Sequence, residues 1–138
     1  ARWPGRIKPG VSEALACQID FPASLAALTG QRLARDDAPD SIDILGAMLR
    51  RTQKGRDHLV EHARTLSLIK GQWKYIHPSK GPKMNKSTNT ELGLDRQPQL
   101  YNLDTDIAER HNLAAEHPEI VKELSGMLEK IKAAGRSR

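Results

Sequence analysis

Cysteine and aromatic residues are scarce in this chain of 138 residues. Its one cysteine, Cys17, cannot close a disulfide within the chain, so no disulfide framework is predicted. The five aromatic residues are not interleaved with basic residues, as the stacking platforms of nucleic-acid-binding proteins are. No uncharged stretch is long enough to span a bilayer. We therefore expect neither nucleic acid nor a membrane as a partner.

Several common catalytic motifs are missing as well. Gly5–Gly10 lacks the Lys-Ser/Thr pair of a phosphate-binding loop. Cys17 lies in an apolar run without local cations to activate it, which favours a structural thiol over a nucleophile. Ala1–Gly5 has neither an initiator Met nor the order of a signal peptide, so we expect the true N-terminus elsewhere.

Basic charge is concentrated in the middle of the chain. The net charge is +5, and residues 57–98 carry seven Lys and Arg against four Asp and Glu. Lys80, Lys83 and Lys86 recur every third residue among amides and hydroxyls, which suits contacts with a polyanion, although a solvated loop explains the same pattern. With 38% hydrophobic residues and a mean hydropathy of −0.60, the chain is long enough for a core but polar for its size.

The first part of the chain predicts two helices after a terminal strand. We expect an edge strand over 1–7, and a helix over Phe21–Thr29 with Asp20 as its N-cap and Gly30 as its left-handed C-cap residue. The apolar residues expected to form the buried face of this helix are Leu25 and Leu28, with Ile19 and Phe21 before them. Ser41 is expected to cap a second short helix.

The second part predicts an antiparallel sheet and one long helix. Two or three short strands are expected among 59–60, 66–69 and 73–76, with Gly71 in a tight hairpin turn, and a further strand over 99–103. Residues 77–98 show little periodicity and are expected to be irregular. A helix over Pro118–Ala134 has an apolar stripe, against which Trp73 and Tyr101 are expected to pack the sheet. The fold class is therefore α+β, a small antiparallel sheet covered by a long C-terminal helix.

Two groups of side chains raise the question of a metal. His58 and His62 could share one face of a strand, and an acidic cluster of four residues could offer oxygens to a divalent cation. The acidic cluster lacks the glycine and terminal Glu of a calcium loop, which favours a solvated linker. Ordinary histidines are likewise the simpler interpretation. The acidic cluster comprises Asp36, Asp37, Asp40 and Asp43.

Four segments, in this order, resemble the C-terminal end of the formylglycine-dependent (type I) sulfatases. They correspond to the Trp-Pro-Gly segment, the following Asp-x-x-Pro helix, the Gly-x-Trp-Lys strand and the Leu-Tyr-Asp/Asn-Leu segment with its turn. In this sequence they are Arg2–Gly10, Ile19–Gly30, Gly71–Ile76, and Leu100–Leu103 with Asp106, Glu109 and Asn112–Ala114.

The resemblance implies the end of an alkaline-phosphatase-like α/β domain over 1–56, as its last strand and helix, and a C-terminal subdomain over 57–138. The family hydrolyses sulfate esters with a formylglycine made from Cys/Ser-x-Pro-x-Arg, beside a calcium ion. Cys17 does not match, since Ile19 and Phe21 stand where Pro and Arg belong. No catalytic residue or metal ligand is carried over. The chain alone is expected to be inactive, and calcium is expected in the full-length enzyme.

The substrate implied by the resemblance is a sulfated carbohydrate, and the implied partner is the N-terminal catalytic domain of the same sulfatase. Candidate substrate-binding residues are His62, Arg64, Lys80, Lys83 and Lys86. The full-length enzyme is expected in the periplasm or secreted. Two alternatives stay open: a free-standing basic module that binds an anionic polymer, and an inactive remnant of a truncated sulfatase.

Overall fold

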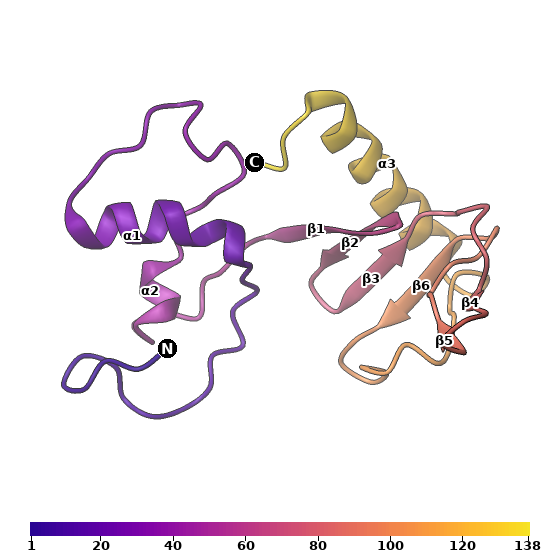
Figure 1. The fold of residues 1–138 in the computed structure, drawn as a ribbon, viewed down its shortest axis with the longest axis horizontal. Helices are drawn as coiled ribbons and strands as arrows, with labels where there is room; N and C mark the ends of the chain where they lie inside the picture. Colours follow the sequence, from indigo (N-terminus) through magenta and orange to yellow (C-terminus); the bar gives the residue numbers. More distant parts are fainter. The chain divides into compact units, whose positions relative to one another are not determined.

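The computed structural model describes residues 1–138, which form two compact units (Figure 1). Unit 1 comprises Ala1–Leu59 with Arg136–Arg138, and unit 2 comprises Val60–Gly135. The expected division between residues 56 and 57 stays a prediction, because compactness alone does not show where a catalytic domain ends.

Unit 2 contains a four-stranded sheet in the order β1-β2-β3-β6. The strands are β1 (His58–Ala63), which begins in unit 1, β2 (Thr65–Lys70), β3 (Trp73–Ile76) and β6 (Gln99–Asn102). β3 pairs antiparallel with both β2 and β6, as expected for an α+β subdomain. Gly71 has a φ of 55° in the two-residue turn between β2 and β3, which confirms the predicted hairpin.

Helix α3 (Pro118–Ala134) covers one face of this sheet and confirms the predicted C-terminal helix. Its Leu124 and Leu128 form the core of unit 2 with Leu68, Tyr75 and Leu100. Burying each leucine contributes roughly 1.5–3 kcal/mol relative to exposure. Gly135 follows the helix at a φ of 67°, the left-handed conformation of a glycine C-cap.

Trp73 and Tyr101 lie on opposite faces of the sheet, so the expectation that both pack against α3 is wrong for Tyr101. Trp73 contacts the core beneath α3, whereas Tyr101 is paired with Lys74 and faces away from it. The Tyr101 hydroxyl donates to Gln99 Oε1 at 2.8 Å, and burial raises the pKa of this phenol. Tyr101 is therefore buried on the other face of the sheet, at 7% exposure.

The segment between β3 and β6 is more ordered than its composition predicts. It contains a small hairpin of β4 (Met84–Asn85) and β5 (Thr90–Glu91), where an irregular loop was expected. Each strand is only two residues long, too short to show periodicity in the sequence.

Unit 1 contains the 3-10 turn η1 (Gln18–Asp20), helix α1 (Phe21–Thr29) and the short helix α2 (Leu45–Met48). α1 and its Gly30 C-cap, at a φ of 71°, confirm the prediction. The strand expected over 1–7 is wrong, because the amides of Arg6 and Ile7 both donate to the carbonyl of Trp3 in a turn. α2 begins after Ile44 rather than after Ser41.

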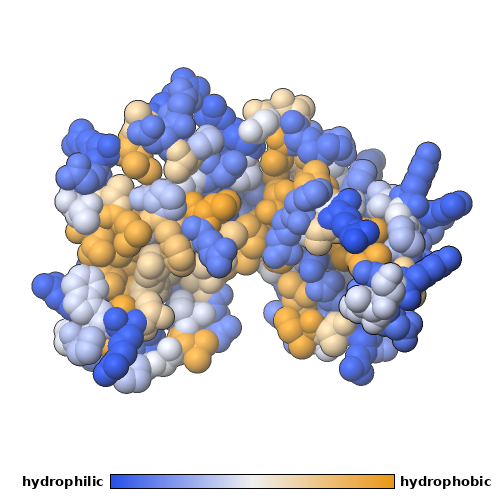
Figure 2. Space-filling view, viewed as in Figure 1, coloured by the Kyte–Doolittle hydropathy of each residue, from blue (hydrophilic) through white to orange (hydrophobic).

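The expected buried face of α1 is exposed, which corrects the prediction for its apolar residues. Phe21 is 46% exposed and Leu25 is 49% exposed, while Ser24 is the buried residue of this helix. Ile19 and Leu28 are exposed as well. Figure 2 shows a hydrophobic surface over this part of unit 1. The cause is that no other element of unit 1 covers the apolar side of α1.

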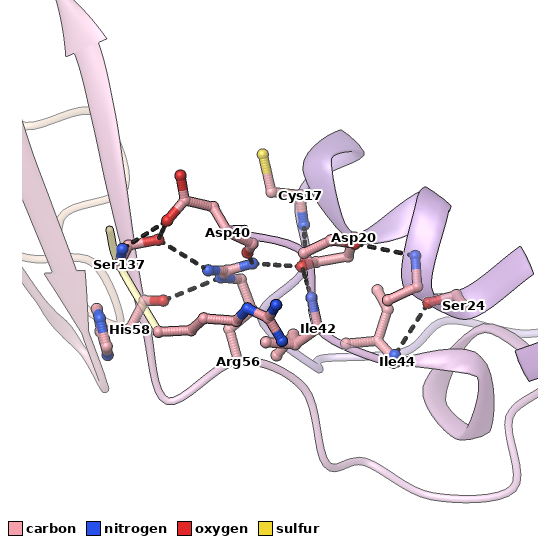
Figure 3. A network of polar contacts seen from close by, with 12 residues as sticks. Cys17, Asp20, Ser24, Asp40, Ile42, Ile44, Arg56, His58 and Ser137 are labelled. Carbon is pink, nitrogen blue, oxygen red and sulfur yellow. Dashed lines mark hydrogen bonds and ion pairs between the residues drawn. The ribbon is translucent and has the colours of Figure 1, made fainter. Parts of the chain in front are cut away.

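Asp20 does not cap α1 but lies at the centre of a buried polar network (Figure 3). Its carboxylate accepts hydrogen bonds from the amides of Cys17 and Ile42, at 3.0 and 3.1 Å, and from the guanidinium of Arg56. The Ser41 hydroxyl accepts from the amide of Ala23 at 3.0 Å, so Ser41 caps the first turn of α1 from another segment. Hydrogen bonds from these residues attach α1 to the rest of unit 1.

Candidate anion-binding site

Strand pairing brings two distant segments together at one end of the sheet. Ile76 at the end of β3 is the register partner of Gln99 at the start of β6. The residues after Ile76 and those before Gln99 therefore leave the sheet side by side. They form a depression of about 440 Å³ that is lined by Pro78, Ser79, Lys80 and Arg96.

Asp95 fixes the geometry of this depression. Its carbonyl accepts from the amide of Ser79 at 2.6 Å, and its Oδ1 accepts from the amide of Gln97 at 3.0 Å. The ammonium of Lys83 pairs with the same carboxylate. The Lys83 hydrogen bond is the first cause that lowers the pKa of Asp95, followed by the amide of Gln97. These contacts of Asp95 therefore join the segment after β3 to the segment before β6.

The layer beneath the depression is also anchored to the sheet. Gln99 Nε2 donates to the carbonyl of Gly93 at 2.9 Å, on the face that carries Tyr101. Leu94, 4% exposed, fills the space next to Gly81, where an added Cβ would meet its side chain. The segment therefore has its own small core.

The three candidate lysines have different surroundings. Lys80 is exposed and lines the depression, whereas Lys83 is engaged by Asp95. Lys86 is exposed in the turn between β4 and β5. Figure 2 shows hydrophilic side chains projecting around this part of unit 2.

His62 lies near the end of β1, and Arg64 lies between β1 and β2. Both are exposed, and Arg64 has a φ of 66°, so the turn holds it in the left-handed conformation. Neither residue lines the depression beside Lys80. Of the five candidates, the depression therefore includes Lys80 alone.

Arg96 lines the depression with Lys80 but was not among the candidate residues. In the sequence it is 16 positions from Lys80 and outside the lysine repeat. The pairing of 73–76 with 99–102 was the signal that could have found it, because that register places the two loop ends together.

No three His, Cys, Asp or Glu residues are grouped to hold a metal in the chain. The four acidic residues of the cluster are each engaged elsewhere. Asp36 faces Arg136, Asp37 and Asp43 accept from nearby amides, and Asp40 accepts from Ser137. Their carboxylates do not fit a calcium site.

A membrane-spanning element is likewise not among the helices, since none combines the length and apolarity that crossing a bilayer requires.

No family model matches the chain. The chain is 48% identical over 133 residues to the N-acetylgalactosamine-6-O-sulfatase of Bacteroides thetaiotaomicron. This alignment covers 95% of the chain and 26% of the relative. A solved structure from work on the metabolism of multiple glycosaminoglycans by Bacteroides thetaiotaomicron superposes on the chain with a TM-score of 0.91, at 48% sequence identity. That match covers 96% of the chain and 28% of the solved chain.

The chain corresponds to the C-terminal portion of a sulfatase. The resemblance found in the four sequence segments is thereby confirmed, and the fold is that of the sulfatase C-terminal region. A putative sulfatase from Bacteroides thetaiotaomicron matches with a TM-score of 0.57 at 20% identity, over 83% of this chain and 24% of that one. This weaker match supports the fold alone.

The chain spans about a quarter of the length of the curated sulfatase that it matches, 26%. Its alignment over 95% of its own residues includes the depression at the end of the sheet and the exposed face of α1.

Proposed function

We propose that this chain is the C-terminal part of a sulfatase that hydrolyses sulfate esters of a glycosaminoglycan-type carbohydrate. The 48% identity to an N-acetylgalactosamine-6-O-sulfatase carries the proposal. By that relationship the substrate carries a 6-O-sulfated N-acetylgalactosamine. A periplasmic or secreted location of the full-length enzyme is part of the same proposal.

In this proposal the chemistry belongs to residues outside the chain. Sulfate ester hydrolysis needs an activated nucleophile, an electrophile facing the sulfate oxygens and an acid for the leaving group. Cys17 is not in a Cys-x-Pro-x-Arg motif, and no metal-binding group is present in residues 1–138. We therefore propose that the chain alone is inactive and that calcium would be held by the rest of the full-length enzyme.

The exposed face of α1 supports the N-terminal catalytic domain as the partner. Several large apolar side chains on and beside this helix are exposed in the chain. They are Ile19, Phe21, Leu25, Leu28 and Leu33. Apolar residues gathered on one surface indicate an interface. The region of the relative that lies outside the match is about three quarters of its length, which is enough to supply the missing layer.

The basic residues of unit 2 supply contacts to the substrate in this proposal. His62 lies near the end of β1 and Arg64 directly before β2, whereas Lys80, Lys83 and Lys86 belong to the segment between β3 and β6. Lys83 reaches the substrate less directly than Lys80, because its ammonium is already paired with Asp95.

The proposal is tested by sulfate release from N-acetylgalactosamine 6-sulfate and from the 4-sulfate isomer by the full-length enzyme. We expect release from the 6-sulfate and little from the 4-sulfate, and no release by residues 1–138 alone. Sulfate release by the 138-residue chain would contradict the proposal that the catalytic residues lie outside it. No activity of the full-length enzyme on any sulfated sugar would favour the inactive remnant.

A free-standing polyanion-binding module is the other candidate, and the net charge of +5 favours it. Such a module would bind unrelated polyanions with a steep salt dependence. Equal binding of double-stranded DNA and a sulfated glycan by the chain would support the module over the sulfatase.

A further inference from the structure

We propose that Lys80 and Arg96, with the hydroxyl of Ser79, form a subsite that binds a sulfate group of the glycan. This inference rests on the proposed function, because the ligand is taken to be a sulfated carbohydrate. Lys80 and Arg96 line one depression of about 440 Å³. The lysine of this loop that forms an ion pair with Asp95 is Lys83. Arg96 belonged to none of the sequence candidates.

The donors around the depression fit a sulfate group. A guanidinium presents a planar fork of N–H donors that can reach two oxygens, and an ammonium adds a compact charge. The Ser79 hydroxyl accepts a hydrogen bond from the amide of Gly81 at 3.2 Å, which leaves its proton free to donate. A sulfate ester offers three terminal oxygens. The lining supplies a guanidinium, an ammonium and a hydroxyl as hydrogen-bond donors.

The size of the depression is suited to part of a glycan. Small-molecule sites commonly measure about 300–1,000 Å³. Pro78 adds an apolar wall beside the cations, on which a sugar ring can pack. The site thus combines an anion-binding end with a surface for the ring that carries the anion.

Asp95 and Lys83 hold the subsite in place. Asp95 precedes Arg96, and its carbonyl binds the amide of Ser79, so one residue joins both sides of the depression. Its carboxylate would repel a sulfate group if it were unpaired. Lys83 neutralises that carboxylate. We therefore assign Lys83 as a positioning residue rather than a contact to the sulfate.

The subsite is tested by amide chemical-shift titration of the 138-residue chain with an oligosaccharide that contains N-acetylgalactosamine 6-sulfate. We expect shifts at Ser79, Lys80 and Arg96. A charge-assisted hydrogen bond is worth enough for Lys80→Ala and Arg96→Ala each to weaken binding about tenfold. Arg96→Lys should recover part of the loss. The matched control is Lys122→Ala, which removes the same charge from an exposed position on α3.

The desulfated oligosaccharide and inorganic sulfate are the comparison ligands. Weaker binding of the desulfated oligosaccharide, by about tenfold or more, supports recognition of the sulfate group. Equal binding with and without sulfate overturns the subsite, and so does an equal loss in Lys122→Ala. Shifts produced by inorganic sulfate but not by the oligosaccharide also overturn it, because the glycan is then not the ligand.

Turnover by the full-length enzyme separates this inference from the proposed function. If the enzyme hydrolyses the 6-sulfate while Lys80→Ala and Arg96→Ala keep the wild-type KM and oligosaccharide affinity, the subsite is wrong and the function stands. If the enzyme releases no sulfate but the chain binds the sulfated oligosaccharide through Lys80 and Arg96, the subsite stands without the activity.

Discussion

The guanidinium of Arg56 donates to the carboxylate of Asp20, and both side chains are buried, at 2% and 0% exposure. The two residues are 36 positions apart in the sequence. Arg56 also donates to the carbonyls of Asp40 and His58, each at 3.1 Å, while Asp20 accepts from two backbone amides. The pair therefore closes a network in which both charges are fully satisfied (Figure 3).

Removing one partner of this pair is expected to destabilise unit 1. Arg56→Met leaves the Asp20 carboxylate buried without its cation, and losing one member of a buried pair costs about 3–5 kcal/mol. The measurement is urea unfolding, together with hydrogen exchange of the amides of Ile42 and Ile44, which bind Asp20 and Ser24.

The control is Arg32→Met, at an exposed position of the same unit. It should change the unfolding free energy by less than about 0.5 kcal/mol. Equal protection of the Ile42 amide in the wild type and in Arg56→Met would show that the pair is not a stabilising element.

Patterns among residues close in sequence predicted elements of the fold. They could not predict which distant residues meet, because those contacts depend on long-range pairing. The stripe of α3 and the Gly71 turn are set by residues close in sequence, so both were predicted. Tyr101 was assigned to the wrong face because a strand's face depends on its register with β3. Arg96 joins Lys80 through that same register, and Asp20 finds Arg56 only in the folded chain.

Replacing Gly126 and Gly135 by alanine is expected to have opposite effects on stability. Gly126 lies within the helix, and an added Cβ there would meet nothing within 4 Å. Gly126→Ala should therefore stabilise the chain by about 0.5–1 kcal/mol. Gly135 has a φ of 67°, so Gly135→Ala should cost about 1–2 kcal/mol. Thermal unfolding followed by circular dichroism at the helix band compares both variants with the wild type.

The contact between Asp40 and Ser137 is expected to weaken in acid. The Ser137 amide, first among several causes, holds the pKa of Asp40 below its ordinary value of 3.8. Because the folded-state pKa is lower than the unfolded one, the stabilisation is complete above about pH 5. It is lost as the pH falls through the folded-state value, where the carboxylate is protonated.

A titration of the Ser137 amide resonance checks this pH dependence. Its midpoint should lie below 3.8 in the wild type, and the transition should vanish in Asp40→Asn. The difference in unfolding free energy between the two proteins should be largest above pH 5. A midpoint above 3.8 would contradict the assignment of Ser137 as the cause.

The exposed apolar face of α1 predicts different effects of one substitution in two contexts. Leu25 is 49% exposed, so Leu25→Lys should change the stability of residues 1–138 by less than about 0.5 kcal/mol. Under the proposal that α1 meets the catalytic domain, the same lysine would be buried at that interface in the full-length protein. Burying an unpaired charge is strongly unfavourable, so the melting temperature should fall by several degrees. Leu25→Met keeps the apolar surface and should behave as the wild type in both contexts. Equal melting temperatures of the full-length wild type and Leu25→Lys would show that another surface meets the catalytic domain.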